Sequence, residues 1–220
     1  MNSFILPDMV DNEDNFRFER FLHSQGLFCI AGCDEAGRGP LAGPVVAACV
    51  VLPTECDHSL FVDSKILSHP KRLKLSNHLL DIGAFWGIGI VSEHKIDEIN
   101  ILQGSLLAMK RAVENLPGLC PDFILVDGKF TIPLLTPQEP LVKGESKSAS
   151  IAAASILAKV ERDRIMTEHH QRFPIYNFQK NKGYPTREHR QAIQKYGICA
   201  IHRKSFRGVR EYAEQSTTSR

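Results

Sequence analysis

The sequence predicts an α/β fold in which a mixed β-sheet is flanked by helices and followed by a small helical C-terminal extension. Two apolar runs early in the chain, 27–33 and 45–52, are typical of strands, and the second is nearly all apolar, as in a central strand. Strand-like and helical segments alternate after them, which is typical of a layered α/β structure. At 220 residues and 43% hydrophobic, the chain can bury one sizeable core, so we expect one domain with an extension.

Each expected element follows from a local pattern. Aromatic and aliphatic residues at helical spacing predict a short helix over 16–24, which Gly26 ends. The two apolar runs follow as strands. The later elements, in chain order, are a helix over 70–81, a strand over 84–92, helices over 93–100 and 105–115, a strand over 123–126, and helices over 146–171 and 187–196.

Turn residues separate these elements. The loop 63–65 precedes the first long helix, and Leu116-Pro117-Gly118 ends the helix over 105–115. The strand over 123–126 ends at Asp127-Gly128. Prolines 133, 137 and 140 then indicate a loop before the longest helix.

The longest predicted helix, 146–171, changes character along its length. Its first half, Ser150 to Ala158, is small and apolar almost all round, which predicts burial against the sheet. The helix becomes charged at Lys159, and the chain is rich in loops from Phe173 onward. We therefore divide the chain into a leader with a short helix (1–26), a core (27–172), an extension (173–210) and a polar, flexible tail (211–220).

Charge is unevenly placed although the formal net charge is only +2. Residues 1–120 carry 10 Lys and Arg against 15 Asp and Glu, whereas 121–220 carry 17 against 10. This asymmetry favours a C-terminal half that faces a polyanion such as a nucleic acid, with a solvated basic face as the alternative.

The cysteines and the chain start indicate the compartment. The six cysteines form no CxxC pair and no zinc-ligand spacing, and Cys29, Cys33, Cys49 and Cys120 lie in or beside apolar segments that suit buried, reduced thiols. The first 17 residues are polar and acidic, unlike a secretory signal, and no apolar stretch approaches 18 residues. We expect a cytoplasmic protein that is not inserted in a membrane.

Two adjacent carboxylates, Asp34 and Glu35, follow the first predicted strand and precede Gly37-Arg38-Gly39. Adjacent carboxylates repel each other by up to about 4 kcal/mol, so a folded chain tolerates them where water or a cation screens them. Glycines let the backbone approach another molecule closely, and an arginine suits a phosphate or a nucleotide edge. The combination indicates hydrolysis of a nucleic acid.

Further carboxylates follow other elements, and each has a second interpretation. Asp127 ends a predicted strand, but an Asp-Gly pair is also an ordinary turn. Asp163 lies where the longest helix becomes polar, but it could form a surface ion pair with a neighbouring arginine. Glu161 competes with Asp163, although the two point about 160° apart on a helix and cannot both face the sheet edge.

Carboxylates that meet at a sheet edge form a hard-oxygen site suited to Mg²⁺ or Mn²⁺. Four carboxylates would balance two divalent ions, which can activate a water and stabilise the leaving oxygen of a phosphodiester. The histidines at 169, 170, 189 and 202 lack carboxylate neighbours at ligand spacing, so structural or phosphate-contact roles are favoured for them.

The motifs closely resemble those of the ribonuclease HII family, in the family's order over roughly residues 28–207. They are Gly32–Val45 (GCDEAGRGPLAGPV), Asp63-Ser64-Lys65, Asp127-Gly128, Lys143-Gly144-Glu145, Ser148–Asp163, Gly183-Tyr184-Pro185-Thr186 and His202-Arg203-Lys204-Ser205-Phe206. The resemblance implies an RNase H-like fold, a monomer, and cleavage of the RNA strand of RNA–DNA hybrids, including single ribonucleotides embedded in duplex DNA. The family often has Lys-Gly-Asp where this chain has Lys-Gly-Glu, which keeps the charge.

Residue roles follow from the same resemblance. It implies that Asp34, Glu35, Asp127 and Asp163 are catalytic and hold two Mg²⁺ or Mn²⁺ ions. The loop Gly37-Arg38-Gly39 would read the ribonucleotide 2′-hydroxyl, and Tyr184 would pack on the neighbouring sugar at the RNA–DNA junction. Lys143, Lys147 and Ser148 would grip phosphates. Arg203 and Lys204 would support the downstream duplex, with packing of the Arg203 stem as the alternative. The core would be catalytic and the extension substrate-binding.

Other classes of protein should differ from this sequence at the same positions. A non-catalytic nucleic-acid binder should have lost one or more of the four carboxylates, and all four are present. A DNA nuclease of the same fold should lack the loop that would read the 2′-hydroxyl. Ribonuclease HIII carries an added N-terminal domain, for which the residues before Leu27 are too few. A clamp-type partner at the C-terminal tail is left open by the sequence.

Overall fold

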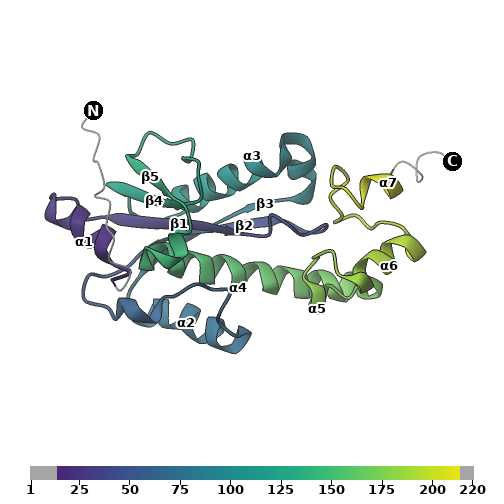
Figure 1. Cartoon of the computed structure of the whole chain (residues 1–220), viewed down its shortest axis with the longest axis horizontal. Helices are drawn as coiled ribbons and strands as arrows, with labels where there is room; N and C mark the ends of the chain where they lie inside the picture. Colours follow the sequence, from purple (N-terminus) through teal and green to yellow (C-terminus); the bar gives the residue numbers. More distant parts are fainter. Residues whose placement is uncertain (1–13, 214–220) are drawn as a thin grey trace.

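The computed structural model describes residues 14–213 of the chain, with a five-stranded mixed sheet at its centre (Figure 1). The strands are β1 (Ile30–Ala36), β2 (Val45–Val51), β3 (Phe85–Val91), β4 (Phe123–Asp127) and β5 (Gln138–Leu141), in the spatial order β3-β2-β1-β4-β5. β2 pairs antiparallel with both β1 and β3, whereas β4 runs parallel to β1 and β5 runs parallel to β4. The mixed α/β sheet expected from the sequence is confirmed.

Helices connect the strands and extend beyond them. The α-helices are α1 (Arg17–Ser24), α2 (His69–Asp81), α3 (Glu93–Glu114), α4 (Ala149–Arg172), α5 (Phe178–Asn181), α6 (Arg187–Tyr196) and α7 (Arg210–Ala213), and the 3-10 helices are η1 (His58–Leu60), η2 (Gly144–Ser146) and η3 (Pro174–Tyr176). Hydroxyl side chains fix three helix starts, because Ser92, Ser148 and Thr186 accept backbone N–H bonds from the first turns of α3, α4 and α6.

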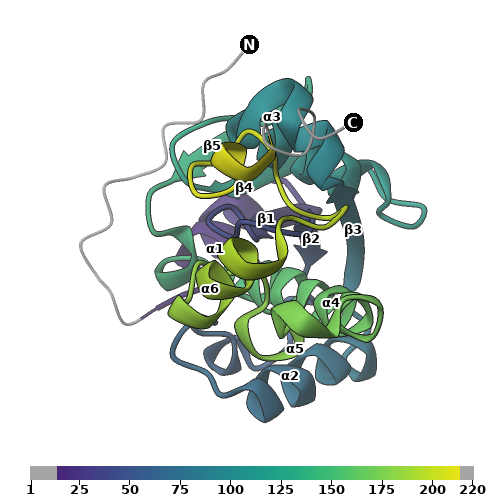
Figure 2. The same cartoon turned by 90° about the vertical axis from the view of Figure 1, so that its right-hand side faces the viewer.

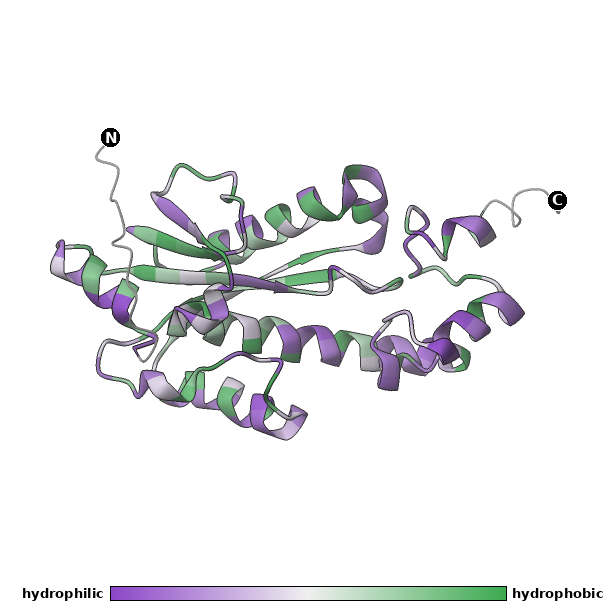
Figure 3. Ribbon diagram, in the orientation of Figure 1, coloured by the Kyte–Doolittle hydropathy of each residue, from purple (hydrophilic) through white to green (hydrophobic). Residues whose placement is uncertain are grey.

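The sheet is covered on both faces. α3 packs on β3 and β2 on one face, and α4 packs on β1 and β2 on the other, with α2 outside α4 (Figures 1 and 2). The hydrophobic colouring of the strands, beside the hydrophilic outer surfaces of the helices, marks the core between these layers (Figure 3). Residues 150–158 of α4 are buried, as their small apolar side chains predict.

Gly32 allows α4 to lie directly on β1. A Cβ added at Gly32 would come within 2.2 Å of the Ser150 carbonyl carbon, so no side chain fits there. The close approach holds α4 against the strand that carries Asp34. Farther along the same helix, Arg162 lies against Gly37, directly after β1.

The C-terminal extension lies at the same end of the sheet as the loop after β1 (Figure 1). A separate apolar cluster joins the two, in which Leu41 and Ala42 of that loop pack with Phe178 and Ile193 of the extension. The Leu41 backbone N–H also donates to the Gly183 carbonyl at 2.8 Å. The extension is therefore packed onto the core beside the loop.

The first strand differs from its predicted bounds. β1 begins at Ile30 rather than Leu27 and continues to Ala36, so Asp34 and Glu35 lie within the strand and not after it. The reason is backbone pairing, because Asp34 lies opposite Ala48 and Glu35 opposite Ala47 in β2. Strand pairing uses backbone groups, so polar side chains near its end did not terminate it.

Two further segments differ from prediction. The proline-rich segment expected to be a loop contains β5, where Pro140 lies opposite Val126; an edge strand with one partner tolerates a proline. The helices expected over 93–100 and 105–115 form one element with a kink at Asn100, whose φ is 66°. The Asn100 side chain accepts the backbone N–H bonds of Leu102 and Gln103, and so caps the second segment.

The ends of the chain fall partly outside the described residues. The leader 1–13 and the tail residues 214–220 lie outside them, but Arg210–Ala213 forms α7, so the tail expected from residue 211 begins in a helix. Cys120, expected to be buried, is exposed, and Cys29 is half-buried. Within residues 14–213, no helix is long and apolar enough to cross a membrane.

Candidate active site

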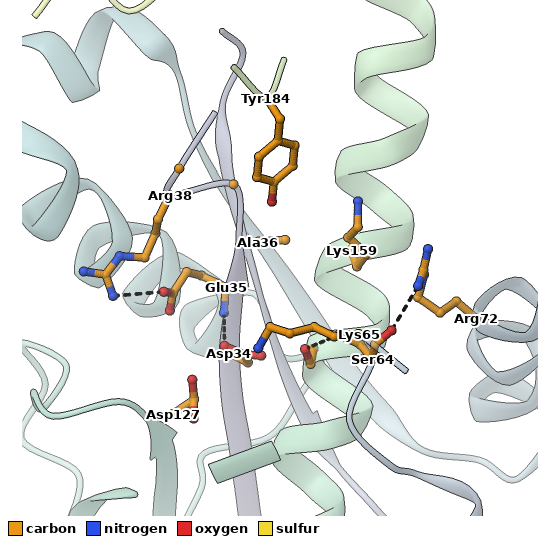
Figure 4. A pocket seen from close by; sticks show the side chains of 13 residues that line it. Asp34, Glu35, Ala36, Arg38, Ser64, Lys65, Arg72, Asp127, Lys159 and Tyr184 are labelled. Carbon is orange, nitrogen blue, oxygen red and sulfur yellow. Dashed lines mark hydrogen bonds and ion pairs between the residues drawn. The ribbon is translucent and has the colours of Figure 1, made fainter. Parts of the chain in front are cut away.

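A pocket opens beside the end of β1, between the loop that follows this strand and α4 (Figure 4). Its walls include the predicted carboxylates Asp34, Glu35 and Asp127, the loop 37–39 and Tyr184. These residues come from β1, from the end of β4 and from the extension. The fold thus brings together three parts of the chain that sequence patterns assigned to one site.

Asp34 and Glu35 form the floor of the pocket. The Asp34 side chain is only 5% exposed, and its Oδ1 accepts a hydrogen bond from the Glu35 backbone N–H at 2.7 Å. The Glu35 Oε1 accepts one from Arg38 Nη1 at 3.3 Å. The loop arginine therefore partly neutralises Glu35, and the charge of Lys65 acts on both carboxylates.

Burial and like charge raise the pKa of all three carboxyl groups. Burial raises the pKa of Asp34 well above its ordinary value, and the charges of Glu35 and Asp127 raise it further. Burial raises the pKa of Glu35 to about 7, against the opposing effect of Arg38. Burial also raises the pKa of Asp127. The pocket therefore disfavours negative charge on its own carboxylates, and a cation bound among them would relieve this cost.

Asp127 is the last residue of β4, and its side chain both accepts a backbone hydrogen bond and lines the pocket. Its Oδ1 accepts the Gly144 backbone N–H at 2.6 Å, which anchors the turn 143–145. The same side chain lines the pocket (Figure 4). Asp127 thus lines the pocket and anchors a turn from another part of the chain, which is a different role from the local Asp-Gly turn that the sequence offered as an alternative.

Asp163, the fourth predicted carboxylate, is not among the residues that line this pocket. It is 4% exposed, and its Oδ1 accepts a hydrogen bond from Lys159 Nζ at 2.5 Å. Lys159, one helical turn earlier, does line the pocket. The competing Glu161 points elsewhere and pairs with Arg164 at 2.7 Å. Asp163 thus contacts Lys159, and its Oδ2 lies 3.9 Å from His69 Nδ1; it does not pair with the neighbouring arginine that the sequence offered as an alternative.

The loop after β1 has a conformation that only glycine accommodates at its start. Gly37 has φ of +103°, and an added Cβ would lie 2.1 Å from Arg162 Nε. Arg38 and Gly39 are exposed, and an added Cβ at Gly39 would lie 3.8 Å from the Tyr184 ring. Tyr184 is 40% exposed and faces the same pocket. The exposed part of the loop and the tyrosine thus flank one opening.

The predicted phosphate-gripping residues lie apart from this pocket. Lys143 is exposed and Lys147 half-buried, and neither lines it. Ser148 has no exposed surface: its hydroxyl accepts the Ile151 backbone N–H at 3.2 Å and donates to Glu19 at 2.6 Å. Because it caps α4 in the core, Ser148 is corrected from a phosphate contact to a structural residue.

Several residues of the pocket were given no site role from the sequence, although all of them except Arg72 lie within motifs that carried the resemblance. They are Ser64, Lys65, Arg72, Ser155 and Lys159. Lys65 forms an ion pair with the buried Glu145, and Arg72 Nη1 donates to the Ser64 carbonyl at 2.9 Å. Lys159 could have been found from its spacing, because a lysine four residues before Asp163 shares its helix face. Ser64 and Lys65 are brought in by packing of the loop before α2, Arg72 by α2 itself and Ser155 by α4, and no local pattern reveals these contacts.

The carboxylates fit a divalent cation by their chemistry. Hard oxygen donors suit Mg²⁺ and Mn²⁺, and Mg²⁺ is commonly held by one or two carboxylates with water and substrate phosphate completing its shell. Among residues 14–213, no three His, Cys, Asp or Glu side chains are grouped closely enough to hold a metal by themselves. Asp34, Glu35 and Asp127 therefore fit as an incomplete set of ligands that waters and a substrate phosphate would complete.

Comparison with known proteins places the chain in a family. The sequence model of ribonuclease HII matches residues 31–209. The ribonuclease HII of Desulfotalea psychrophila is 61% identical over 206 residues, covering 93% of this chain and 92% of that protein. The crystal structure of ribonuclease H2 from Pyrococcus horikoshii superposes with a TM-score of 0.71 at 26% identity, over 87% of this chain and all of that one.

A second solved structure gives the same fold. It is the PCNA:RNase HII complex from Archaeoglobus fulgidus, which matches with a TM-score of 0.67 at 26% identity, over 82% of this chain and 96% of that one. The family match spans β1 to the C-terminal extension and so includes every residue that lines the pocket. The chain belongs to the ribonuclease HII family.

Proposed function

We propose that this family member hydrolyses the RNA strand of RNA–DNA hybrids and nicks duplex DNA on the 5′ side of a single embedded ribonucleotide, leaving 3′-hydroxyl and 5′-phosphate ends. One observation carries the proposal: a single pocket combines three carboxylates, the buried Asp34 and the half-buried Glu35 and Asp127, with a glycine loop and an exposed tyrosine. The carboxylates suit metal-assisted phosphodiester hydrolysis, and the loop with the tyrosine suits recognition of a sugar.

The proposed cofactors are two divalent ions, Mg²⁺ or Mn²⁺. Asp34, Glu35, Asp127 and Asp163 would hold them, and when bound such ions lower the pKa of a water and stabilise the leaving oxygen. The 2.5 Å contact with Lys159 Nζ engages only Oδ1 of Asp163, so Oδ2 can serve as a ligand while that contact is kept. The chain itself contributes the buried carboxylates, whose repulsion in the absence of a cation favours cation binding.

Recognition of the ribonucleotide is assigned to the loop 37–39 and Tyr184. A 2′-hydroxyl both donates and accepts a hydrogen bond, so exposed backbone groups of a glycine loop can read it directly. Arg38 is exposed and bound to Glu35 by one 3.3 Å contact, which leaves guanidinium donors free to approach a phosphate. Tyr184 would pack on the neighbouring sugar, and Lys143 and Lys147 would contact phosphates farther along the strand.

The decisive experiment uses a 5′-labelled DNA duplex with one embedded ribonucleotide, incubated with the protein and Mg²⁺ or Mn²⁺. We expect one nick on the 5′ side of the ribonucleotide, lost when EDTA is added. An all-DNA duplex of the same sequence is the control. Binding without any nick would favour a non-catalytic nucleic-acid-binding protein, and cutting of the all-DNA duplex would favour a DNA nuclease.

The proposal extends to organisation, compartment and partners. Residues 27–172 would form the catalytic core and 173–210 the substrate-binding extension of a monomer. A reducing cytoplasm suits the six cysteines, which are all free thiols. The Archaeoglobus fulgidus protein is described in complex with PCNA, so our proposal for this chain includes binding to a clamp-type partner. Co-elution of the full chain with its cognate clamp on size-exclusion chromatography tests it.

A further inference from the structure

We infer that His202 and Arg203 are positioning residues that hold the two recognition elements, the loop 37–39 and Tyr184, in register with each other. Neither residue lines the pocket, and both are buried, with 1% and 0% of their surface exposed. The inference rests on the proposed function, because it concerns how the loop and the tyrosine of that pocket are held in place.

Arg203 binds the loop after β1 through its whole guanidinium group. Its Nη2 donates to the Gly37 carbonyl at 2.6 Å, and its Nε donates to the Gly43 carbonyl at 2.9 Å. Its Nη1 donates to the carbonyls of Arg38 at 3.0 Å and Pro40 at 2.9 Å. Because a guanidinium is a rigid planar donor, the loop cannot move away without losing several of these bonds together.

The surroundings of Arg203 indicate a positioning role more than a stabilising one. Among the ion pairs described for residues 14–213, none involves Arg203, and backbone carbonyls replace a carboxylate as its partners. Burial lowers the pKa of Arg203 to about 9, and the nearby charge of Arg162 acts in the same direction. The charges of Glu93 and Asp97 oppose this shift without forming an ion pair with Arg203, so the conformation that the arginine imposes on the loop is the better explanation of its burial.

His202 reaches Tyr184 through His189. The His189 Nδ1 lies 2.9 Å from the Tyr184 carbonyl, and a carbonyl only accepts, so Nδ1 carries the proton. Neutral His189 then presents Nε2 as an acceptor, 3.0 Å from His202 Nε2, which must donate. The remaining His202 Nδ1 accepts the Cys199 backbone N–H at 2.9 Å. These hydrogen bonds together fix the tautomers of both imidazole rings, and they connect the Tyr184 carbonyl to the Cys199 backbone N–H.

Backbone pairing places these two side chains between the elements they contact. His202 forms an isolated antiparallel bridge with Ala42, and the Arg203 backbone N–H donates to the Leu41 carbonyl at 2.9 Å. Leu41 is in turn bonded to the Gly183 carbonyl. One short segment thus contacts the loop through Arg203 and the Tyr184 backbone through His202 and His189.

Loosening this arrangement should affect the two substrate types unequally. A duplex with one embedded ribonucleotide offers a single 2′-hydroxyl and a single junction, so the loop and Tyr184 must be correctly placed together. A long RNA–DNA hybrid offers a 2′-hydroxyl at every position, so a displaced loop still finds a productive register. The ratio of kcat/KM for the single-ribonucleotide duplex to kcat/KM for the long hybrid therefore reports positioning, and it does not depend on the folded fraction of the enzyme.

The first test is Arg203→Lys, which keeps the charge and the aliphatic stem but loses the planar donor. We expect this ratio to fall by about tenfold or more, as small misplacements of binding groups cost about that much. Arg164→Lys is the matched control, because Arg164 is an exposed arginine paired with Glu161 and Glu168, and it should leave the ratio unchanged. Thermal unfolding of each variant checks that it folds.

The second test is the pair His202→Asn and His202→Gln, which applies even if Arg203→Lys does not fold. Glutamine can place an amide N–H where His202 Nε2 donates, whereas asparagine is too short to reach His189. We expect the ratio to fall in His202→Asn and to stay close to wild type in His202→Gln.

The outcomes separate the two hypotheses. Unchanged ratios in both Arg203→Lys and His202→Asn would overturn the positioning role while leaving the proposed function intact. Equal losses in the two His202 variants would overturn the hydrogen-bond chain to Tyr184. Failure of the wild-type protein to cleave either substrate would instead overturn the proposed function.

Discussion

Asp34 is a residue whose environment opposes its own charge. It is buried, and the carboxylates of Glu35 and Asp127 lie close enough to raise its pKa further. A carboxylate in such a place destabilises the folded chain unless a cation accompanies it. Sites that conflict with stability in this way are typical of function.

This conflict leads to a prediction for Asp34→Asn. The amide cannot serve as an anionic ligand, so we expect cleavage of the embedded-ribonucleotide duplex to fall by at least about a hundredfold. Binding of the duplex, measured by fluorescence anisotropy, should stay largely intact because the recognition loop is unchanged. In metal-free buffer the melting temperature should stay level or rise, since a buried charge has been removed. Turnover near the wild-type rate would contradict the assignment of Asp34.

Gly37 gives a second prediction at the same scale. Gly37→Ala combines a φ of +103° with a Cβ 2.1 Å from Arg162 Nε, so both the backbone and the buried arginine must shift. Gly118→Ala is a matched control, with φ of +67° and no atom within 4 Å of the added Cβ. The control should lose about 1 kcal/mol of unfolding free energy from backbone strain alone.

We expect Gly37→Ala to lose more unfolding free energy than this control and also to lose activity, both measured by urea unfolding and the nicking assay. Equal losses of stability in the two variants, with activity retained, would show that the loop conformation at Gly37 is not required.

At the scale of elements, the sequence located strands where backbone pairing and side-chain chemistry agree. β2 was predicted within one residue because every side chain is apolar and the strand is central. The end of β1 was predicted too early because Asp34 and Glu35 have charged side chains, although their backbone is still paired with β2. β5 was missed because Gln138-Glu139-Pro140-Leu141 has no strand pattern, and its pairing with β4 is a long-range contact.

The candidate site divides in the same way. Four carboxylates, the glycine loop and Tyr184 were expected together, and all of them except Asp163 line one pocket, because motifs at strand ends converge in an α/β sheet. The side chains that hold them were not expected as such. A buried arginine such as Arg203 and an exposed one such as Arg207 look alike in a sequence, since burial is set by the tertiary fold.

Tyr184 supports a prediction that belongs to the connection between α5 and α6. Its ring is 40% exposed beside Gly39, and its carbonyl is held by His189, so the side chain can be removed without disturbing the backbone bond. We expect Tyr184→Ala to reduce kcat/KM several-fold more on the single-ribonucleotide duplex than on a long hybrid, because stacking on one sugar matters most where there is one junction.

Tyr184→Phe is the control for this prediction, since it keeps the ring and should keep the substrate preference. Equal losses on the two substrates in Tyr184→Ala would remove junction sensing from the proposal.

At the scale of the whole molecule, the extension and the sheet meet around the pocket. Of the 27 Lys and Arg residues, 17 follow residue 120, and the extension brings part of this charge to the end of the sheet where the loop lies. A duplex held there would contact the basic extension and the carboxylate pocket together. The contact between them depends on the buried histidine pair, His189 and His202, so the state of this pair should influence the stability of the entire chain.

The buried pair makes that stability depend on pH. Burial lowers the pKa of His202 to about 3, with the adjacent His189 acting in the same direction. The Tyr176 ring, edge-on at 4.9 Å, the Phe178 ring at 5.8 Å and the Cys199 thiol, with Sγ 3.1 Å from Nδ1, also lie against His202, and none of them is a carboxylate. Between pH 6.5 and about 3 the unfolded chain therefore holds a proton on this residue that the folded chain does not.

The unfolding free energy should consequently fall as pH decreases through this window, by up to about 1.4 kcal/mol per pH unit from His202 alone. His202→Gln cannot titrate, so its unfolding free energy should decline less steeply over the same range. Urea unfolding of both proteins at pH 7.5, 6.0 and 5.0, read by tryptophan fluorescence, measures the two slopes. Parallel slopes would contradict this prediction, because they would mean that His202 has the same pKa in the folded and the unfolded chain.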